Sequence, residues 1–300
     1  MPRSNPARDL LLGLIYGVKI IGLDIGGSKI DGILWQDGKI LNSAKIKTPR
    51  NRKGFLESLS SLIKGLTGGK EVKGIGIAMA GAIDIKSGVV MKSPNMKFVN
   101  NFSLAGFIQK KFRRPVAIDN DTHCFLLGES RFGAIRGKKN VVALSLGTGT
   151  GGAVLIEGQM LRGKDGAAGE LGQIIIEEAK GKFYTVEDLI SGHGFARYSK
   201  KRPREIESLA REGNRRMIKI YKNIGKYLGI ALANYINIFN PEIIVIGGGI
   251  SHSGKLILRP AIREMKKHAL IPPSKYPIIK ISKLEHAGAL GAVALFFSKN

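Results

Sequence analysis

The sequence is poor in the residues that build covalently cross-linked or metal-held scaffolds. Its 300 residues include a single cysteine, Cys124. One thiol cannot form an internal disulfide, and it excludes a cysteine-rich metal site. We interpret Cys124 as a small buried thiol on a helix. Hydrophobic residues make up 43% of the chain, which is typical of a globular protein.

Long apolar runs are missing as well. No run reaches the ~18 residues that a membrane-spanning helix needs, and the apolar segment 10–15 is too short for a signal peptide. We therefore expect a cytoplasmic protein without a membrane partner. Residues 1–17 precede the first predicted strand, so we expect them to form an extension outside the fold, and we hypothesise that translation starts at Val18.

Acidic residues are scarce relative to basic ones. The chain has 23 Asp and Glu against 48 Lys and Arg, which gives a formal net charge of +25. Such a surface attracts polyanions in general. The basic residues form scattered groups, such as 110–114 and 200–204, and we find neither a helix-turn-helix segment before the core nor an aromatic and basic RNA-binding signature. We expect no specific nucleic-acid partner.

Two segments of the chain, 23–34 and 144–155, follow the same pattern. Each consists of an apolar strand, a tight turn of glycine and hydroxyl residues, and a second apolar strand. A glycine turn between strands leaves backbone N–H groups free to bind phosphate oxygens. The repetition therefore predicts one phosphate-binding hairpin in each half of a chain that is long enough for two lobes.

The remaining pattern is that of a mixed α/β protein. The periodicity of apolar residues predicts strands over 19–24, 30–35, 40–46, 72–79, 116–118 and 243–246. It predicts helices over 53–65, 120–132, 214–239 and 287–297. The last helix is rich in small residues and apolar on most sides, so we expect it to pack inside the protein.

Six motifs, taken together and in this order, resemble those of the ROK family (repressor, open reading frame, kinase), which belongs to the actin, hexokinase and heat-shock chaperone superfamily. They lie at 24–29, 80–84, 120–121, 146–152, 169–172 and 247–249. The resemblance covers residues 18–297. It implies a two-lobed actin-like ATPase (ribonuclease H-like) α/β fold with duplicated mixed β-sheet lobes, a small lobe of 18–120 plus 287–300 and a large lobe of 121–286.

The resemblance also implies an activity, the ATP-dependent phosphorylation of a hydroxyl of glucose or a close relative. Phosphoryl transfer depends on positioning and charge neutralisation. By its match to the family, Asp24 would orient Mg²⁺ through water. The residues implied in ATP binding are Asp24, Gly26, Gly27, Ser28, Lys29, Gly147, Thr148, Gly149, Gly247, Gly248 and Gly249.

The catalytic base implied by the family is Asp121, which would take the proton of the attacking sugar hydroxyl. Asp121 could also cap the helix that begins there. Carboxylates and amides suit a polyol because each makes two hydrogen bonds at once. The matching sugar ligands are Gly81, Asn101, Asn120, Asp121, Glu170, Gln173 and Glu187.

One family feature is absent. Most members hold a structural zinc through cysteines and one histidine, but segment 176–186 contains no cysteine and Gln173 occupies the histidine position. A zinc site needs about four nitrogen or sulfur ligands, so we predict no zinc. The carboxylate of Glu187 is retained, yet the sequence offers no account of what braces the loop before it.

Two alternatives stay open beside an ATP-dependent kinase. The basic charge is compatible with inorganic polyphosphate as the donor. A catalytically silent, sugar-sensing regulator is the other alternative, against which the retained Asp121 speaks. Family members often form dimers, and this sequence leaves the oligomeric state open.

Overall fold

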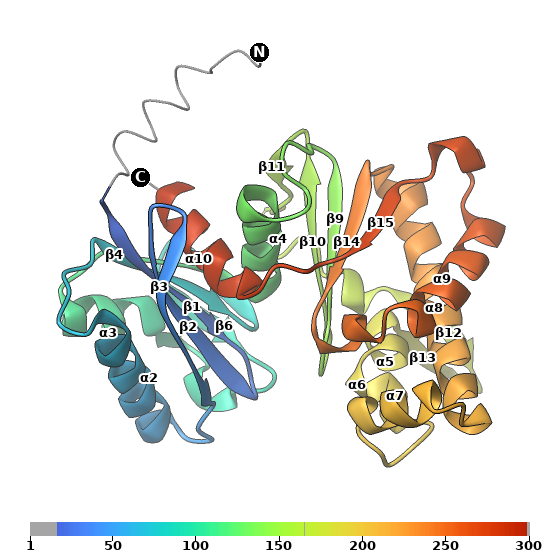
Figure 1. Cartoon of the computed structure of the whole chain (residues 1–300), viewed down its shortest axis with the longest axis horizontal. Coiled ribbons are helices and arrows are strands. Elements are labelled where there is room, and N and C mark those ends of the chain that lie inside the picture. Colours follow the sequence, from blue (N-terminus) through green and yellow to red (C-terminus); the bar gives the residue numbers. More distant parts are fainter. Residues whose placement is uncertain (1–16, 165, 299–300) are drawn as a thin grey trace. The chain divides into compact units, whose positions relative to one another are not determined.

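The computed structural model describes residues 17–164 and 166–298 (Figure 1). These divide into two compact units, unit 1 with residues 17–132 and 285–298 and unit 2 with residues 133–284. The extension expected over residues 1–17 lies outside the described residues, except for Gly17.

Unit 1 is built on a five-stranded sheet with the order β3-β2-β1-β4-β8. Strand β2 is antiparallel to both β3 and β1, while β4 and β8 run parallel to β1. Isoleucine and leucine make β1 almost fully buried. The strands are β1 (Lys19–Ile25), β2 (Lys29–Gln36), β3 (Lys39–Lys47), β4 (Gly74–Met79) and β8 (Val116–Asn120).

Two helices cover opposite faces of this sheet, α2 (Arg52–Thr67) and α10 (Ala287–Ser298). Glycines in the strands allow α10 to approach closely, because a methyl group at Gly22 or Gly76 would overlap the backbone of Ala289 or Ala292. The expectation that the last helix packs inside is confirmed, since nine of its residues are buried.

The helix α4 (Asp121–Phe132) follows β8 and packs against α10, so it belongs to unit 1. The lobe boundary predicted at 120/121 lies at the start of α4, whereas the compact unit extends to Phe132, the end of this helix. That boundary was drawn at a sequence motif, whereas the packing of α4 depends on the distant C-terminal helix. The smaller elements of unit 1 are β5 (Ala82–Asp84), β6 (Val89–Lys92), η1 (Lys97–Val99), β7 (Phe102–Ser103) and α3 (Leu104–Phe112).

Unit 2 repeats the sheet of unit 1. Its strand order β11-β10-β9-β14-β15 has the same sequence of antiparallel and parallel pairs. The strands are β9 (Val141–Leu146), β10 (Thr150–Ile156), β11 (Gln159–Met160), β14 (Ile243–Gly247) and β15 (Ile278–Ile281). The expected duplication of a mixed sheet is therefore confirmed.

The core of unit 2 forms around the long helix α8 (Arg215–Phe239), which begins at the Asn214 cap and ends at the left-handed Asn240. Helix α9 (Lys255–His268) packs closely on it at Gly225 and Gly229. The other elements are η2 (Leu171–Gln173), β12 (Ile175–Ala179), β13 (Lys182–Thr185), α5 (Val186–Ile190), α6 (Gly192–Ala196), α7 (Pro203–Arg211), η3 (Gly249–Ser253) and η4 (Pro273–Lys275). Within the described residues, no helix is both long and apolar enough to cross a bilayer.

Candidate active site

The turn between β1 and β2 is closed by a backbone hydrogen bond, in which the amide of Gly26 donates to the carbonyl of Lys29 over 3.0 Å. A Cβ at Gly27 would lie 2.5 Å from the Cβ of Asn95, so only glycine fits at this position. Ser28 and Lys29 are exposed. The turn therefore combines a tight backbone with polar groups that are open to a ligand.

Asp24 lies at the end of β1, directly opposite Asp31 on β2. Burial, together with the charges of Asp121 and Asp31, raises the pKa of Asp24 to about 7. No described residue donates a hydrogen bond to its carboxylate. A carboxylate that is disfavoured by burial and by like charges is stabilised when a cation or a hydrogen-bond donor binds next to it. Asp24 thus has the chemistry of a ligand-binding group.

The junction of β8 and α4 carries Asn120 and Asp121. The side-chain oxygen of Asn120 accepts hydrogen bonds from the amides of Thr122 (2.8 Å) and His123 (3.2 Å), so Asn120 caps the helix. Asp121 Oδ1 also accepts from the Thr122 amide at 2.9 Å. Burial raises the pKa of Asp121, while the bonds from Thr122 act in the opposite direction. Within the described part of the chain, no residue donates a hydrogen bond to Oδ2 of Asp121.

Gly81 is held next to this junction, since Asn120 Nδ2 donates to its carbonyl at 3.0 Å. Its φ of +127° suits glycine, and a side chain here would overlap the backbone of Lys92. Four predicted residues of unit 1, Asp24, Gly81, Asn120 and Asp121, are thus linked by hydrogen bonds or by charge.

Asn101 is placed differently from these residues. It is exposed, adopts a left-handed φ of +55° and donates its amide to the carbonyl of Val90 at 2.7 Å. Its neighbour Asn100 is tied down instead, because Oδ1 of Asn100 accepts from the amide of Ser93 at 2.8 Å. The side chain of Asn101 is open to a ligand, and its sugar-binding role stays a prediction.

The corresponding turn in unit 2 is braced by Glu187. Oε2 of Glu187 accepts from the amide of Thr150 at 2.7 Å, and its carboxylate fills the space that a side chain at Gly149 would need. Gly147 is bonded on both sides, donating its amide to Gly149 and accepting from Gly192, each over 2.9 Å. Glu187, which was predicted as a sugar ligand, therefore shapes the β9–β10 turn.

The glycine segment after β14 lies against the strand that leads into this turn. Gly248 has a φ of +83°, and a methyl group on it would overlap the backbone of Leu146. Gly248 and Gly249 are exposed. Glu170 and Gln173 are exposed at the two ends of η2, where the amide of Gln173 donates to the carbonyl of Glu170 at 3.0 Å.

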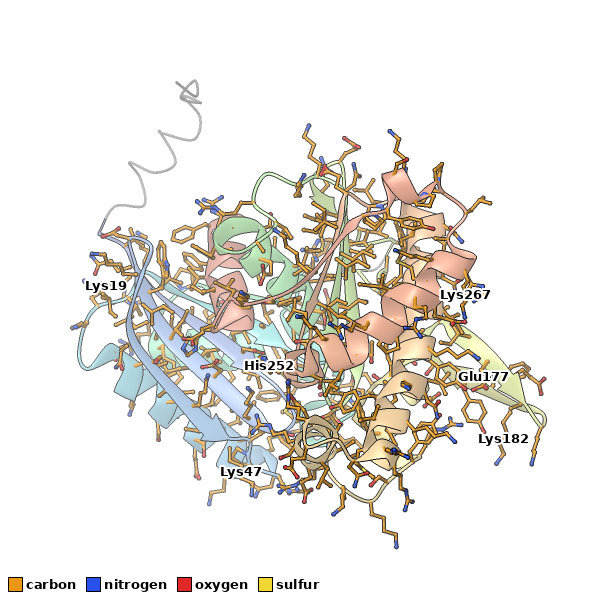
Figure 2. The ribbon with its side chains drawn as sticks, turned by 45° about the vertical axis from the view of Figure 1, so that its right-hand side comes forward. Lys19, Lys47, Glu177, Lys182, His252 and Lys267 are labelled. Atoms are coloured by element: carbon orange, nitrogen blue, oxygen red, sulfur yellow. The ribbon has the colours of Figure 1, made fainter. Side chains whose placement is uncertain are left out.

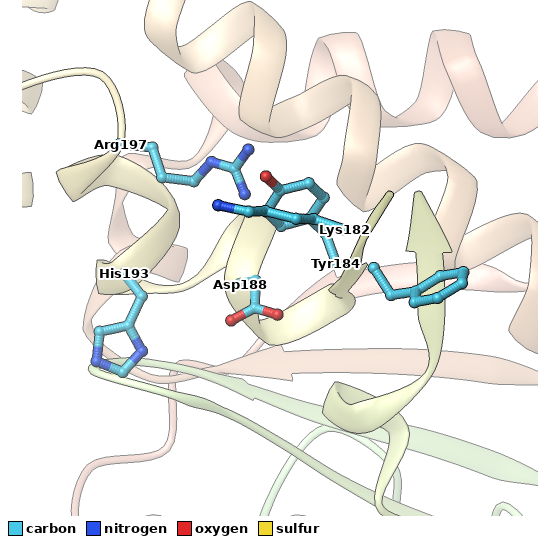
Figure 3. Close-up of a pocket in the computed structure, with 6 residues that line it drawn as sticks. Lys182, Tyr184, Asp188, His193 and Arg197 are labelled. Atoms are coloured by element: carbon cyan, nitrogen blue, oxygen red, sulfur yellow. The ribbon is translucent and has the colours of Figure 1, made fainter. Parts of the chain in front are cut away.

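The loop before Glu187 is a β-hairpin formed by β12 and β13, on which Glu177 and Lys182 lie (Figure 2). Tyr227 of α8 donates its hydroxyl to Glu177 Oε1 at 2.9 Å. The guanidinium of Arg197 lies 4.0 Å from the centre of the Tyr184 ring (Figure 3). A hydrogen bond and a cation–π contact thus hold the hairpin, which answers what the sequence left open.

Helix α5 is fixed at its start by a capping box. The Thr185 hydroxyl accepts from the amide of Asp188 at 3.2 Å, and the Asp188 carboxylate accepts from the amide of Thr185 at 2.9 Å.

A cavity of about 480 Å³ lies beside α5 and is lined by Lys182, Phe183, Tyr184, Asp188, His193 and Arg197 (Figure 3). His193 is exposed on α6, and among the described residues it belongs to no cluster of three or more His, Cys, Asp or Glu that could hold a metal.

Metal ligands are few in the described residues, where no group of three or more His, Cys, Asp or Glu side chains could hold an ion. The absence of zinc stays a prediction that metal analysis has to test. A divalent cation would take most of its ligands from a bound phosphate and from water, and Asp24 is the carboxylate of the β1–β2 turn that could hold it.

Sequence reasoning missed two buried pairs next to the predicted residues. His123 Nδ1 lies 3.0 Å from Asp119 Oδ1, and His286 Nδ1 lies 2.9 Å from both carboxylate oxygens of Asp31. Both aspartates follow directly on apolar residues within their strands. An acidic residue inside such a strand was the available signal, because a buried charge needs a partner.

The chain has two equivalent mixed sheets, and in each a glycine turn joins the two strands of the first hairpin. This arrangement is that of the actin-like ATPases. The sequence model of the ROK family matches residues 20–299, and the chain belongs to this family.

Individual relatives agree with this assignment. Glucokinase of Thermotoga maritima is 32% identical, with 93% of this chain and 97% of that protein covered. A xylose repressor of Caldicellulosiruptor bescii is 30% identical and covers 93% of this chain, which spans 78% of the repressor. The crystal structure of a ROK family glucokinase from Streptomyces griseus in complex with glucose and AMPPNP superimposes with a TM-score of 0.82 at 27% identity, covering 92% of this chain and 98% of that one.

Proposed function

We propose that this chain is a sugar kinase, which transfers the γ-phosphoryl group of ATP to a hydroxyl of glucose or a closely related hexose. The observation that carries the proposal is the pair of carboxylates at the ends of β1 and β8. Asp24 and Asp121 are electrostatically coupled, and burial raises the pKa of each. Perturbed carboxylates beside a glycine turn are typical of a catalytic site. The similarity to glucokinases supports the same class.

The two glycine turns are the proposed binding sites for the phosphates. In unit 1, Gly26, Gly27, Ser28 and Lys29 would contact them, and in unit 2 Gly147, Thr148 and Gly149. The exposed backbone at Gly248 and Gly249 suits the nucleoside, and Gly247, buried at the end of β14, leads into it. Bound Mg²⁺ would neutralise charge on the phosphate oxygens, and Asp24 is the residue that would hold it, through water. A cation next to Asp24 would offset the unfavourable burial of its carboxylate and the repulsion from Asp121 and Asp31, which supports this role.

Asp121 is the proposed general base. The sugar hydroxyl donates a hydrogen bond to Asp121, and its proton moves to the carboxylate as the oxygen attacks the γ-phosphorus and ADP leaves. Because burial raises the pKa of Asp121, the carboxylate accepts a proton more readily than an exposed aspartate does. The hydrogen bond from the Thr122 amide to Oδ1 holds the side chain, and Oδ2 is left for the substrate.

Hexose recognition is assigned to the polar groups that match the family's sugar ligands. Gly81, Asn101 and Asn120 of unit 1 would contribute, with Glu170, Gln173 and Glu187 of unit 2. A site of this kind discriminates strongly against analogues that lack a hydroxyl, because its polar groups would then be unpaired. The identity of the sugar is the part of the proposal that an experiment has to supply.

A coupled ADP-release assay over hexoses and N-acetylhexosamines tests the function, with Asp121→Asn as the matched negative control. We expect ATP-dependent turnover with glucose or a near relative. If phosphorylated sugar forms with polyphosphate and not with ATP, the donor is polyphosphate and that part of the proposal is wrong. If calorimetry shows that the sugar binds but neither donor supports turnover, the proposed kinase activity is rejected.

Sugar binding without turnover would favour a sugar-sensing regulator, and the similarity to a xylose repressor is the observation that supports this alternative. A regulator does not require a base next to the sugar. The raised pKa and the open Oδ2 of Asp121 therefore favour the enzyme.

A further inference from the structure

A largely buried contact between Asp31 and His286 connects the first hairpin to the last helix of unit 1. The side chains of Asp31 and His286 are 7% and 13% exposed, and Nδ1 of His286 lies 2.9 Å from each carboxylate oxygen of Asp31. The two residues are 255 positions apart in the sequence. The ammonium group of Lys45 lies 3.6 Å from the same carboxylate, but its side chain is 54% exposed.

His286 stands directly before α10 and starts this helix. Its carbonyl accepts the amide of Leu290 at 2.8 Å, and its own φ is +55°. The left-handed backbone turns the chain into the helix, and the imidazole ties the start of the helix to β2. Movement of this side chain would therefore move the first turn of α10.

The first turn of α10 lies against Asp24. A Cβ at Gly288 would be 2.5 Å from Oδ2 of Asp24, so the backbone of the helix and this carboxylate are in contact without an intervening side chain. Asp31 is also the cross-strand neighbour of Asp24. The same pair thus borders Asp24 from two sides, through the adjacent strand and through the helix.

We propose that Asp31 and His286 are positioning residues for nucleotide binding, because their buried pair holds the first turn of α10 against Asp24 and keeps the carboxylate of Asp24 in place. This inference rests on the proposed role of Asp24 at the nucleotide phosphates. Without the imidazole, the carboxylate of Asp31, whose charge already acts on Asp24, would be buried with only the exposed Lys45 as a partner.

The test is the affinity for a non-hydrolysable ATP analogue with Mg²⁺, measured by calorimetry, together with the KM for ATP and for sugar. His286→Gly removes the imidazole and still permits the positive φ. We expect it to weaken binding of the analogue by about tenfold, as is usual when a supporting partner is lost. His286→Asn retains a donor near the position of Nδ1, and we expect it to bind within about threefold of the wild type. The KM for the sugar should not change.

Lys45→Met is the matched control, since it removes the exposed cation from the same carboxylate, and we expect wild-type binding. If His286→Gly lowers the melting temperature but binds the analogue normally in the folded protein, the pair is structural only and the inference is wrong. Asp24→Asn separates this outcome from failure of the proposed function. Normal binding by Asp24→Asn would remove the assigned role of Asp24 itself, whatever His286→Gly does.

Discussion

The two glycine turns have equivalent strands around them but different charges beside them. At the β1–β2 turn, Asp24 interacts with two further carboxylates, and no described residue donates to it. At the β9–β10 turn, Ser145 stands in the place of Asp24, and the nearby Glu187 is bonded to the amide of Thr150. The duplication has therefore kept the backbone geometry, while an unpaired acidic group remains in one copy only. We infer that the first turn serves cation-bound phosphate and the second serves phosphate through N–H groups.

The largest expected effect is that of Asp121→Asn. The amide cannot take the proton of the attacking hydroxyl, so kcat should fall by about 10²- to 10⁴-fold. Affinities for sugar and nucleotide, measured by calorimetry, should stay near the wild-type values because the shape of the side chain is preserved. Turnover close to that of the wild type would remove Asp121 as the base.

The comparison between the turns predicts unequal effects for equivalent positions. Asp24→Asn should weaken Mg-nucleotide binding by about 10- to 100-fold, since the only carboxylate that we assign to the cation is lost. Ser145→Ala, the matched change in the second hairpin, should alter it less than about threefold. Titration of both variants with the nucleotide analogue checks this, and equal losses would mean that the two turns have equivalent roles.

Asp24 should also cost stability when it is ionised. Its pKa rises from 3.8 to about 7 in the folded protein, so its contribution to stability is complete below about pH 4 and is lost as the pH rises toward 7. Asp24→Asn removes this loss. We expect the variant to be more stable than the wild type by about 2 to 4 kcal/mol at pH 8. Urea unfolding at both pH values measures the difference, which should vanish near pH 4.

Within the second turn, two glycines should differ. Gly149→Ala places a methyl group on the carboxylate of Glu187, whereas nothing lies within 4 Å of a Cβ at Gly147. We expect Gly149→Ala to lower the free energy of unfolding by about 1 to 3 kcal/mol, as overpacking does, and Gly147→Ala to leave it nearly unchanged. Equal unfolding midpoints for the two variants would show that the side chain of Glu187 moves aside at no cost in stability.

The smallest effect is expected at the hairpin before Glu187. Tyr227→Phe removes the hydroxyl that bonds to Glu177, and one such bond contributes about 1 kcal/mol. Thermal unfolding should show a small decrease in the melting temperature. The KM for the sugar should rise slightly if the hairpin positions Glu187, and it should not change in Lys182→Met, a control on the same hairpin.

Much of the fold was predictable because it depends on local signals. The predicted helix over 214–239 agrees with α8, and the proline after Asn240 marks its end. The glycine and hydroxyl residues of both turns indicated the two hairpins, which the strand pairing confirms. The roles assigned to the site residues came from motif order and stay predictions.

The contacts around those residues were not predictable in the same way. Glu187 was expected on the sugar, yet its bond to Thr150 joins residues 37 positions apart. The pair of Asp31 with His286 spans 255 positions, and no local pattern connects the two. Asn120, and not Asp121 alone, caps α4, which depends on side-chain geometry and not on residue type.

By itself, the sequence determined the alternation of strands and helices, the two glycine turns and the placement of Asp24 and Asp121 at strand ends, because these follow from backbone preferences and apolar periodicity over short stretches of chain. The tertiary structure decided which carboxylate is left without a partner, what braces Glu187 and how α10 meets Asp24. Those properties are sums of burial, charge and contact over distant residues, so they exist only once the chain has folded.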